Sequence, residues 1–300
     1  MRRLHGDGHS RSRRVTYIAS LALISAMSAF GPGRGTGHAA GNGPSAQAPG
    51  ITYGGRPWVP SGLFPVAVAP VDWAVPRGYR CELVRRRVHD FREKLVALTF
   101  DDGPDGKVTP RILEALAAHR ARATFFVLGE RVRLHARLLR QMATAGHAIG
   151  NHSYSHPAHP SAQDAQRELR ATQELIREVT GRPPSCFRPP YGITKNALTR
   201  LALRQGYATV LWTIDSGDAL GYERQDIATR ATRAPAPGQI ILFHDGPGHH
   251  STAEAVPTIL EKLSAAGFQF VTIPELLQAW DQWLRQSRSA AACSSTGAGG

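Results

Sequence analysis

A chain of 300 residues, 42% of them apolar, can bury one large core or two small ones, and three cysteines are too few for a disulfide scaffold. The net charge of +13 falls only to +8 without the first forty residues, which hold six Arg and one Asp, so anionic surroundings are favoured. The Lys and Arg residues are scattered and not interleaved with aromatic side chains, so we expect no nucleic-acid partner.

Residues 1–40 have the form of an export signal. A basic head precedes a mostly apolar run of sixteen residues, 15–30, which is shorter than the ~20 residues of a membrane-spanning helix. Small residues follow, and Ala39 or Ala40 could precede a cleavage point. We therefore expect a secreted or cell-surface protein. An uncleaved anchor is the alternative, and this segment would then be the only membrane contact.

The rest of the chain divides by composition into three parts. Residues 41–93 are rich in Gly and Pro at first and predict an irregular segment or linker that packs on the following domain. Residues 94–285 carry the regular pattern of a folded domain, and residues 286–300 predict a disordered tail. Cys81 and Cys186 could form a disulfide in an oxidising compartment, but their distance is not fixed by the sequence.

Short apolar runs alternate with helix-period segments throughout residues 94–285. The predicted strands are 95–100, 123–127, 147–150, 186–188, 207–212, 239–243 and 268–271. The predicted helices are 109–118, 132–145, 161–180, 195–204, 224–233, 252–265 and 274–285, and several of them end at a glycine. This order predicts an α/β fold with parallel strands, outer helices and a barrel-like closure.

Polar side chains of complementary chemistry follow these predicted strands. Asp101 and Asp102 follow the first strand, His152 and His156 the third, and His244 ends the sixth. Because barrels place their active sites at the carboxyl ends of the strands, we expect these side chains to meet. Taken alone, the Asp-Asp-Gly-Pro stretch has a simpler interpretation as a turn that feeds the next helix.

The spacing of His152 and His156 indicates a metal site. On a helical turn, residues four apart present both imidazoles on one face, and a carboxylate from the Asp101–Asp102 pair would complete a set of two His and one Asp. Three protein ligands with one open position are typical of catalytic zinc, which lowers the pKa of water to about 7. The other Asp would then be free to accept a proton. Two ordinary surface histidines are the alternative.

Five motifs in order resemble the polysaccharide deacetylases, the family with the chitooligosaccharide deacetylase (NodB) homology domain. The motifs are Thr99-Phe100-Asp101-Asp102-Gly103-Pro104, His152-Ser-Tyr-Ser-His156, Arg188-Pro-Pro-Tyr191-Gly192, Trp212-Thr-Ile-Asp215-Ser-Gly-Asp218 and Leu242-Phe243-His244. The resemblance covers roughly residues 94–285. It implies a distorted (β/α)7 barrel and a hydrolase that depends on a divalent metal ion, Zn2+ first and Co2+ as an alternative.

The resemblance also implies roles for the reacting groups. Asp101 resembles the general base, and His244 resembles the general acid. Asp102, His152 and His156 resemble the metal ligands. Taken without the resemblance, His244 could equally be a buried histidine that Asp245 or a backbone carbonyl satisfies.

Four further residues match positioning roles in the family. Arg188 resembles the arginine that orients the base, and Asp215 resembles the carboxylate that hydrogen-bonds the catalytic histidine. Tyr191 matches a position whose backbone N–H helps to hold the oxyanion, and Leu242 matches an apolar wall of the acetyl pocket. A surface ion pair is the alternative for Arg188.

One position departs from the family pattern. The fourth motif usually ends in a Trp that walls the acetyl pocket, and here that position is Ala219. The departure removes no catalytic group, but it puts the shape of the pocket and the choice of substrate in doubt. His249 and His250 follow a Gly-Pro-Gly stretch and are interpreted as loop residues that bind no metal.

The leading interpretation is an exported deacetylase of polymers of N-acetylglucosamine, with peptidoglycan of the cell wall as the favoured substrate and chitin-type oligomers as the alternative. The same residues would also serve an esterase that removes O-acetyl groups from acetylated xylan. A non-catalytic sugar-binding module is a third hypothesis. The intact set of Asp101, His152, His156 and His244 argues against this last one.

Overall fold

The computed structural model describes residues 52–53, 56–57 and 72–296, with side chains described for 72–289. The chain divides into two units, residues 1–60 and 61–300. In the first unit, β1 (Thr52–Tyr53) pairs antiparallel with β2 (Arg56–Pro57). The predicted export signal at residues 1–40 lies outside the described residues. Among the helices that are described, none is both long and apolar enough to cross a membrane.

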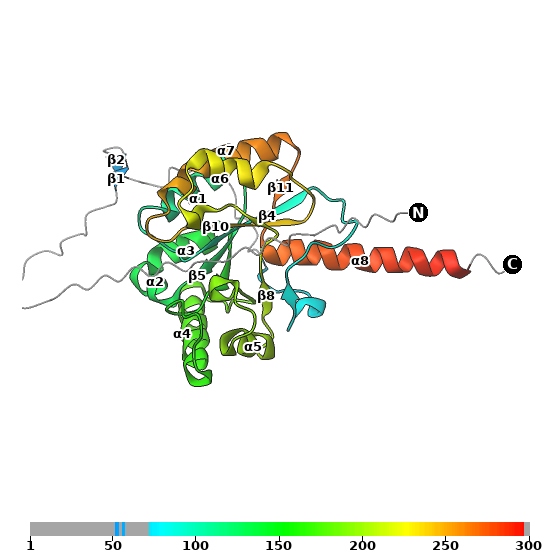
Figure 1. The fold of residues 1–300 in the computed structure, drawn as a ribbon, viewed down its shortest axis with the longest axis horizontal. Helices are drawn as coiled ribbons and strands as arrows, with labels where there is room; N and C mark the ends of the chain where they lie inside the picture. Colours follow the sequence, from blue (N-terminus) through cyan, green and yellow to red (C-terminus); the bar gives the residue numbers. More distant parts are fainter. Residues whose placement is uncertain (1–51, 54–55, 58–71, 297–300) are drawn as a thin grey trace, which may run out of the picture. The chain divides into compact units, whose positions relative to one another are not determined.

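A parallel sheet of nine strands forms the centre of the second unit (Figure 1). Its order is β3-β8-β7-β6-β5-β4-β10-β9, and β11 pairs with the first residues of β4. The strands are β3 (Leu83–Val84), β4 (Leu95–Asp101), β5 (Thr124–Val127), β6 (Ala148–Asn151), β7 (Cys186–Phe187), β8 (Ala208–Val210), β9 (Ile214–Asp215), β10 (Gln239–His244) and β11 (Gln269–Phe270). The predicted α/β class and parallel pairing are therefore confirmed.

Eight α-helices accompany these strands in the described part of the chain. They are α1 (Thr109–Ala118), α2 (Gly129–Leu134), α3 (Ala136–Thr144), α4 (Ala162–Thr180), α5 (Ala197–Arg204), α6 (Arg224–Thr232), α7 (His250–Ala265) and α8 (Ile273–Thr296). Three short 3-10 helices, η1 (Arg77–Tyr79), η2 (Pro190–Gly192) and η3 (Asp218–Leu220), lie in the connections. Helices alternate with parallel strands, as a barrel of β/α units requires.

One bent segment closes the sheet into a distorted barrel. Within residues 208–215, β8 pairs with β7, whereas β9 pairs with β10 at the other end of the strand order. The backbone N–H of Thr213 donates to the carbonyl of Ile240 and continues this second pairing toward the bend. The edge strand β9 and β8, which lies next to the opposite edge strand β3, are therefore joined by one short stretch of chain, and the predicted (β/α)7 barrel is confirmed.

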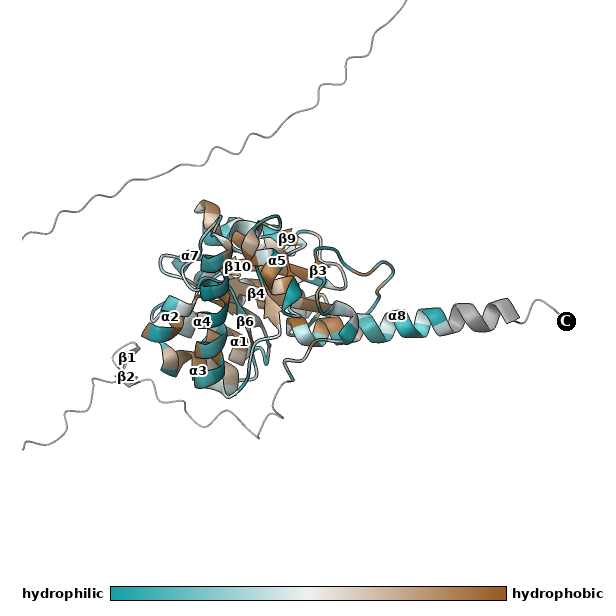
Figure 2. Ribbon diagram, turned by 90° about the horizontal axis from the view of Figure 1, so that it is seen from below, coloured by the Kyte–Doolittle hydropathy of each residue, from teal (hydrophilic) through white to brown (hydrophobic). Residues whose placement is uncertain are grey.

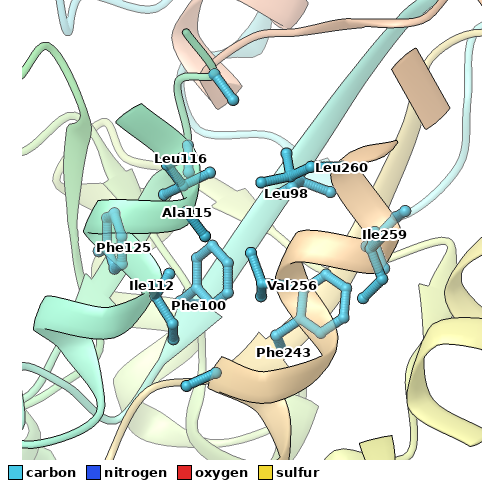
Figure 3. Close-up of a cluster of buried hydrophobic side chains, with 14 of the residues drawn as sticks. Leu98, Phe100, Ile112, Ala115, Leu116, Phe125, Phe243, Val256, Ile259 and Leu260 are labelled. Atoms are coloured by element: carbon cyan, nitrogen blue, oxygen red, sulfur yellow. The ribbon is translucent and has the colours of Figure 1, made fainter. Parts of the chain in front are cut away.

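Alternating side chains along β4 and β10 belong to two separate cores. On the outer face, Phe100 stacks between Phe125 and Phe243, with ring centroids 5.0 and 5.4 Å apart, under side chains of α1 and α7 (Figure 3). On the inner face, Ala97 and Ile240 lie in a second cluster with Trp280 of α8. Because successive residues point to opposite faces, the inner-facing positions at the strand ends are left for the site.

Capping residues set the ends of α4, a helix of 19 residues. Ser161 accepts a hydrogen bond from the backbone N–H of Asp164 at the start of α4, and Gly181 ends the helix with φ of 76°. Figure 2 shows α4 with much hydrophilic colour and the central strands with more hydrophobic colour. This helix buries one stripe, which includes Leu169 and Ile176, against the barrel.

Three sequence predictions about boundaries are wrong. β3, from the segment predicted to be irregular, pairs with β8, so the domain begins before residue 94. The predicted helix 132–145 is two helices, α2 and α3, separated at His135, where ψ is 36°. α8 continues to Thr296 through part of the predicted tail, because the stretch after Arg285 contains three consecutive Ala and neither Gly nor Pro to end the helix.

The two cysteines considered for a disulfide are both free. Cys81 is exposed, whereas Cys186 is buried on β7. Burial raises the pKa of the Cys186 thiol to about 12. This thiol is therefore protonated and acts as a small apolar side chain of the inner core.

Candidate active site

The predicted polar residues gather at the carboxyl ends of the strands. Asp101 is the last residue of β4, and His244 is the last residue of β10, directly opposite it in the ladder. His152 follows β6, and Arg188 follows β7. The backbone alone therefore brings the first, third, fourth and sixth predicted strand ends together.

One carboxylate and two imidazoles form a compact cluster. The Oδ1 atom of Asp102 lies 3.4 Å from Nε2 of His152 and 3.5 Å from Nε2 of His156. One ligand atom from each residue lies within 4.8 Å of the other two. This is the donor set of an oxygen and two nitrogens that suits a catalytic divalent ion.

The hydrogen bonds of this cluster fit a bound cation. Nδ1 of His152 donates to the carbonyl of Arg188 at 2.7 Å, since a carbonyl only accepts, and its Nε2 lone pair therefore faces Asp102. Burial is the main cause that lowers the pKa of His152 to about 3, so the ring is neutral. Oδ1 of Asp102 is buried and forms no hydrogen bond among the described residues. Lone pairs that face one another without a proton between them leave room for a cation.

A loop, not a helical turn, brings His152 and His156 together. Ser153 and His156 both have positive φ, at 74° and 62°. The backbone N–H of His156 donates to Oγ of Ser153, and the carboxylate of Glu168 accepts from the N–H groups of Tyr154 and Ser155. The prediction that the imidazoles meet is correct, but its helical reason is wrong.

Asp101 lies beside this cluster and is held by Arg188. Nη1 of Arg188 donates to Oδ1 of Asp101 at 2.8 Å and to Oγ1 of Thr99 at 2.9 Å. The guanidinium is fully buried and stacks 4.2 Å from the ring centroid of Phe126. Burial raises the pKa of Asp101, and the charge of Arg188 opposes that rise. The arginine therefore fixes the carboxylate and keeps it available as a base.

Asp218, and not Asp215, is the partner of His244. Oδ1 of Asp218 lies 2.9 Å from Nδ1 of His244, and its Oδ2 accepts from the His244 backbone N–H at 2.6 Å. Asp215 is exposed and accepts from the backbone N–H of Gly217. Gly217, with φ of 79°, turns the chain so that Asp218 comes back under β10. The prediction that Asp215 hydrogen-bonds His244 is therefore wrong, because Asp218, three residues later, makes that contact.

The carboxylate of Asp218 keeps His244 protonated. Burial lowers the pKa of His244, but the hydrogen bond and charge of Asp218, followed by the charges of Asp101 and Asp102, outweigh it and raise the pKa to about 9. Asp218 also accepts from Oγ1 of Thr252 and from the backbone N–H of Ala219. With Nδ1 engaged, Nε2 of His244 is the nitrogen with a proton to donate.

His249 belongs to the site, although the sequence placed it in a loop. Its ring stacks on that of His244, with centroids 5.1 Å apart and planes at 22°. It also lines a cavity of about 190 Å3 together with Asp102 and His156. His249, His244 and Asp218 form a second cluster of possible metal ligands, within the same 4.8 Å limit. His250 is the exposed first residue of α7.

Tyr191 and Leu242 lie close to the site by different means. Tyr191 is exposed, has φ of 57°, and its ring contacts that of His156 at 4.4 Å between centroids. Its backbone N–H forms no hydrogen bond among the described residues. Leu242 is buried two residues before His244 and therefore faces the same side of β10. Ala219, at the departing position, is exposed at the start of η3.

Comparison with known proteins identifies the family. Residues 89–210 match the family model of the polysaccharide deacetylases. The chain is 38% identical over 193 residues to a peptidoglycan-N-acetylglucosamine deacetylase of Bacillus cereus, a match that covers 63% of this chain and 70% of that protein. The chain belongs to the polysaccharide deacetylase family and is a hydrolase of that class.

Two further relatives are also named as peptidoglycan deacetylases. Peptidoglycan-N-acetylglucosamine deacetylase PgdA of Listeria monocytogenes is 39% identical over 186 residues, which cover 61% of this chain and 39% of that protein. The structure of the peptidoglycan deacetylase PdaC from Bacillus subtilis aligns with a TM-score of 0.59 and 34% identity, over 66% of this chain and 96% of that chain. The chain thus spans almost all of the solved PdaC chain and about two fifths of the Listeria protein.

Proposed function

We propose that this protein is a metal-dependent deacetylase that hydrolyses the N-acetyl groups of N-acetylglucosamine in peptidoglycan. The observation that carries the proposal is the buried, unpartnered Oδ1 of Asp102, which faces the two Nε2 atoms of His152 and His156. A paired base, Asp101, and a protonated histidine, His244, lie beside that donor set. Zn2+ is the ion that we propose, since two imidazoles and one carboxylate suit it.

The chain's own residues divide the chemistry between a base and an acid. When bound, the ion supplies Lewis-acid chemistry, which polarises the acetyl carbonyl and lowers the pKa of water. Asp101, oriented by Arg188, accepts the proton of the attacking water. The backbone N–H of Tyr191, which forms no hydrogen bond among the described residues, is the donor that we propose for the oxyanion that develops during hydrolysis.

His244 completes the reaction by protonating the leaving nitrogen. An amine leaves poorly without a proton, and a pKa of about 9 keeps His244 charged at neutral pH. Asp218 orients the ring through Nδ1, so Nε2 carries the proton toward the substrate. Leu242, on the same face of β10, is proposed to contact the acetyl methyl group.

The peptidoglycan substrate is supported by the relatives, whose names specify peptidoglycan. An O-acetyl ester would be attacked by the same residues, and Ala219 changes the pocket wall where the family usually has Trp. The test is acetate release from peptidoglycan, chitin oligomers and acetylxylan under one set of conditions. We expect the highest kcat/KM on peptidoglycan, and a preference for acetylxylan would contradict the proposal.

We also propose that the enzyme works outside the cytoplasm, on the basis of the basic head and sixteen-residue apolar run of residues 1–40. Fractionation of cells that express the full chain should find the mature protein in the medium or at the cell surface, beginning near Gly41. A reporter fused behind residues 1–40 should be exported, and the same reporter without them should not. Intact chain in the cytosol would contradict the proposal.

A further inference from the structure

A cavity beside the candidate metal ligands is lined by one positively charged side chain, which has no role in the proposed deacetylation chemistry. It has a volume of about 190 Å3 and is lined by Asp102, Leu128, Arg131, His156, Gly246, Pro247 and His249. Asp102 and His156 belong to the donor set already described. Arg131 is the one Arg or Lys among these lining residues.

The guanidinium of Arg131 is only partly satisfied within the protein. Its Nε is buried and forms no hydrogen bond among the described residues. Oε1 of Glu130 lies 4.0 Å from that Nε, which is too far for a hydrogen bond, and the Arg131 side chain is 28% exposed. An N–H that is buried without a partner costs free energy, and an anion bound in the cavity would recover it.

A neighbouring arginine on the same helix shows the contrast. Nη1 of Arg133 donates to the phenol oxygen of Tyr154 at 3.2 Å, and Arg133 does not line the cavity. Both side chains carry one positive charge on α2, two residues apart, but of the two only Arg131 lines the cavity. Arg133 is therefore a matched control for the loss of one charge.

We propose that Arg131 binds a carboxylate of the polymer substrate and so makes the enzyme select acidic glycan over neutral glycan. This inference rests on the proposed function and names the feature of peptidoglycan that is recognised. The planar fork of a guanidinium matches a carboxylate with two parallel hydrogen bonds. Peptidoglycan carries carboxylates on the lactyl group of muramic acid and on its peptides, whereas chitin carries none.

The experiment compares Arg131→Gln, Arg131→Lys, Arg133→Gln and wild type on three substrates. Peptide-free glycan strands expose the lactyl carboxylate. Strands with attached peptides have that carboxyl group blocked as an amide and expose the peptide carboxylates instead. Chitin oligomers of matched length are neutral. The readout is the ratio of kcat/KM on each acidic glycan to kcat/KM on chitin.

We expect Arg131→Gln to lower at least one acidic-to-neutral ratio about tenfold, mainly through KM, since one charge-assisted contact to a partly exposed group is lost. If the ratio falls for the peptide-free glycan, Arg131 binds the lactyl carboxylate; if it falls for the peptide-bearing glycan, Arg131 binds a peptide carboxylate. Arg131→Lys should lose less, because it keeps the charge without the fork. Arg133→Gln should leave both ratios within about twofold of wild type.

A direct binding measurement keeps the test independent of turnover. Calorimetry with N-deacetylated, peptide-free and peptide-bearing strands should show weaker binding to Arg131→Gln than to wild type. Equal binding and equal ratios in wild type and Arg131→Gln would overturn the inference, and so would an equal loss on chitin. The proposed function fails by a different result, namely that the wild-type enzyme releases no acetate from either form of peptidoglycan.

Discussion

Two clusters of the same composition, one carboxylate and two imidazoles, flank the end of β4, and their hydrogen bonds differ. In the cluster of Asp102, His152 and His156, the carboxylate has a buried oxygen without a hydrogen bond, and the His152 ring is neutral. In the cluster of Asp218, His244 and His249, both carboxylate oxygens accept hydrogen bonds, and His244 is protonated.

The comparison shows that the hydrogen-bond partners of the side chains, and not the residue types, decide whether such a cluster binds a metal ion or holds a proton. Nδ1 of His152 donates to a carbonyl, which leaves Nε2 as a lone pair for a cation. Nδ1 of His244 donates to a carboxylate, which stabilises the ring with a proton on both nitrogens. We infer that the first cluster holds the metal ion and the second holds the catalytic proton.

The largest expected effect is that of His152→Ala, which removes a ligand from the first cluster. We expect the purified variant to contain no stoichiometric divalent ion and to lose at least about 10³-fold in kcat/KM, because the Lewis acid is lost. Elemental analysis and acetate release are the measurements. His159→Ala, which changes an exposed histidine of the same loop, is the control. Full metal occupancy in His152→Ala would show that the ligand assignment is wrong.

Asp101→Asn and Asp102→Asn should distinguish the general base from the metal ligand. The amide keeps the size of the side chain but cannot accept the proton of water, so kcat should fall by about 10²–10⁴-fold while the metal content stays at the wild-type level. Asp102→Asn should lose metal first, and added metal should partly restore its activity. If the metal is lost from Asp101→Asn and kept in Asp102→Asn, the two roles are reversed.

Asp218→Asn should change both the pKa of His244 in the second cluster and the pH dependence of kcat. Without the carboxylate, burial would lower the pKa of His244 from about 9, so the ring would lose its proton at lower pH. The alkaline limb of the kcat profile should move to lower pH, and kcat at pH 8 should fall about 10²-fold. Asp215→Asn, on an exposed carboxylate of the same motif, should shift neither quantity. A shift in Asp215→Asn alone would restore the original assignment.

The smallest effect should come from His249→Phe. The phenyl ring keeps the stacking on His244 but has no ligand nitrogen, so kcat should change less than about threefold and the metal content should not change. A tenfold loss of activity together with the loss of an ion would show that the second cluster binds metal.

The helices could be predicted from the sequence because their apolar residues follow a helical period, and the longer strands because they are continuous apolar runs that are buried on both faces. The predicted helix 109–118 has the bounds of α1, and the predicted strand 95–100 lies within β4. β3 and β9 have two residues each and show no periodicity, and their pairing depends on the barrel around them. The extension of α8 could have been predicted from the absence of Gly and Pro in residues 286–296.

The site could be predicted where sequence motifs at the strand ends mark its residues, and not where the conformation of a turn decides which residue enters it. The motifs placed Asp102 with His152 and His156, and Asp101 with Arg188. The choice of Asp218 over Asp215 depends on the left-handed turn at Gly217, which no spacing reveals. The stacking of His249 on His244 and the exposure of Arg131 to the cavity arise from tertiary contacts between distant segments. Neither had a local sequence signal.

The most direct test of the central claim is the number of divalent ions per chain in three proteins: wild type, Asp102→Asn and Asp218→Asn. Each would be loaded with Zn2+, dialysed against metal-free buffer and measured by elemental analysis. We predict one ion per chain in wild type and in Asp218→Asn, and less than 0.1 (about a tenfold loss of occupancy or more) in Asp102→Asn. Two ions in wild type, or loss of the ion from Asp218→Asn with retention in Asp102→Asn, would contradict the division of roles between the clusters.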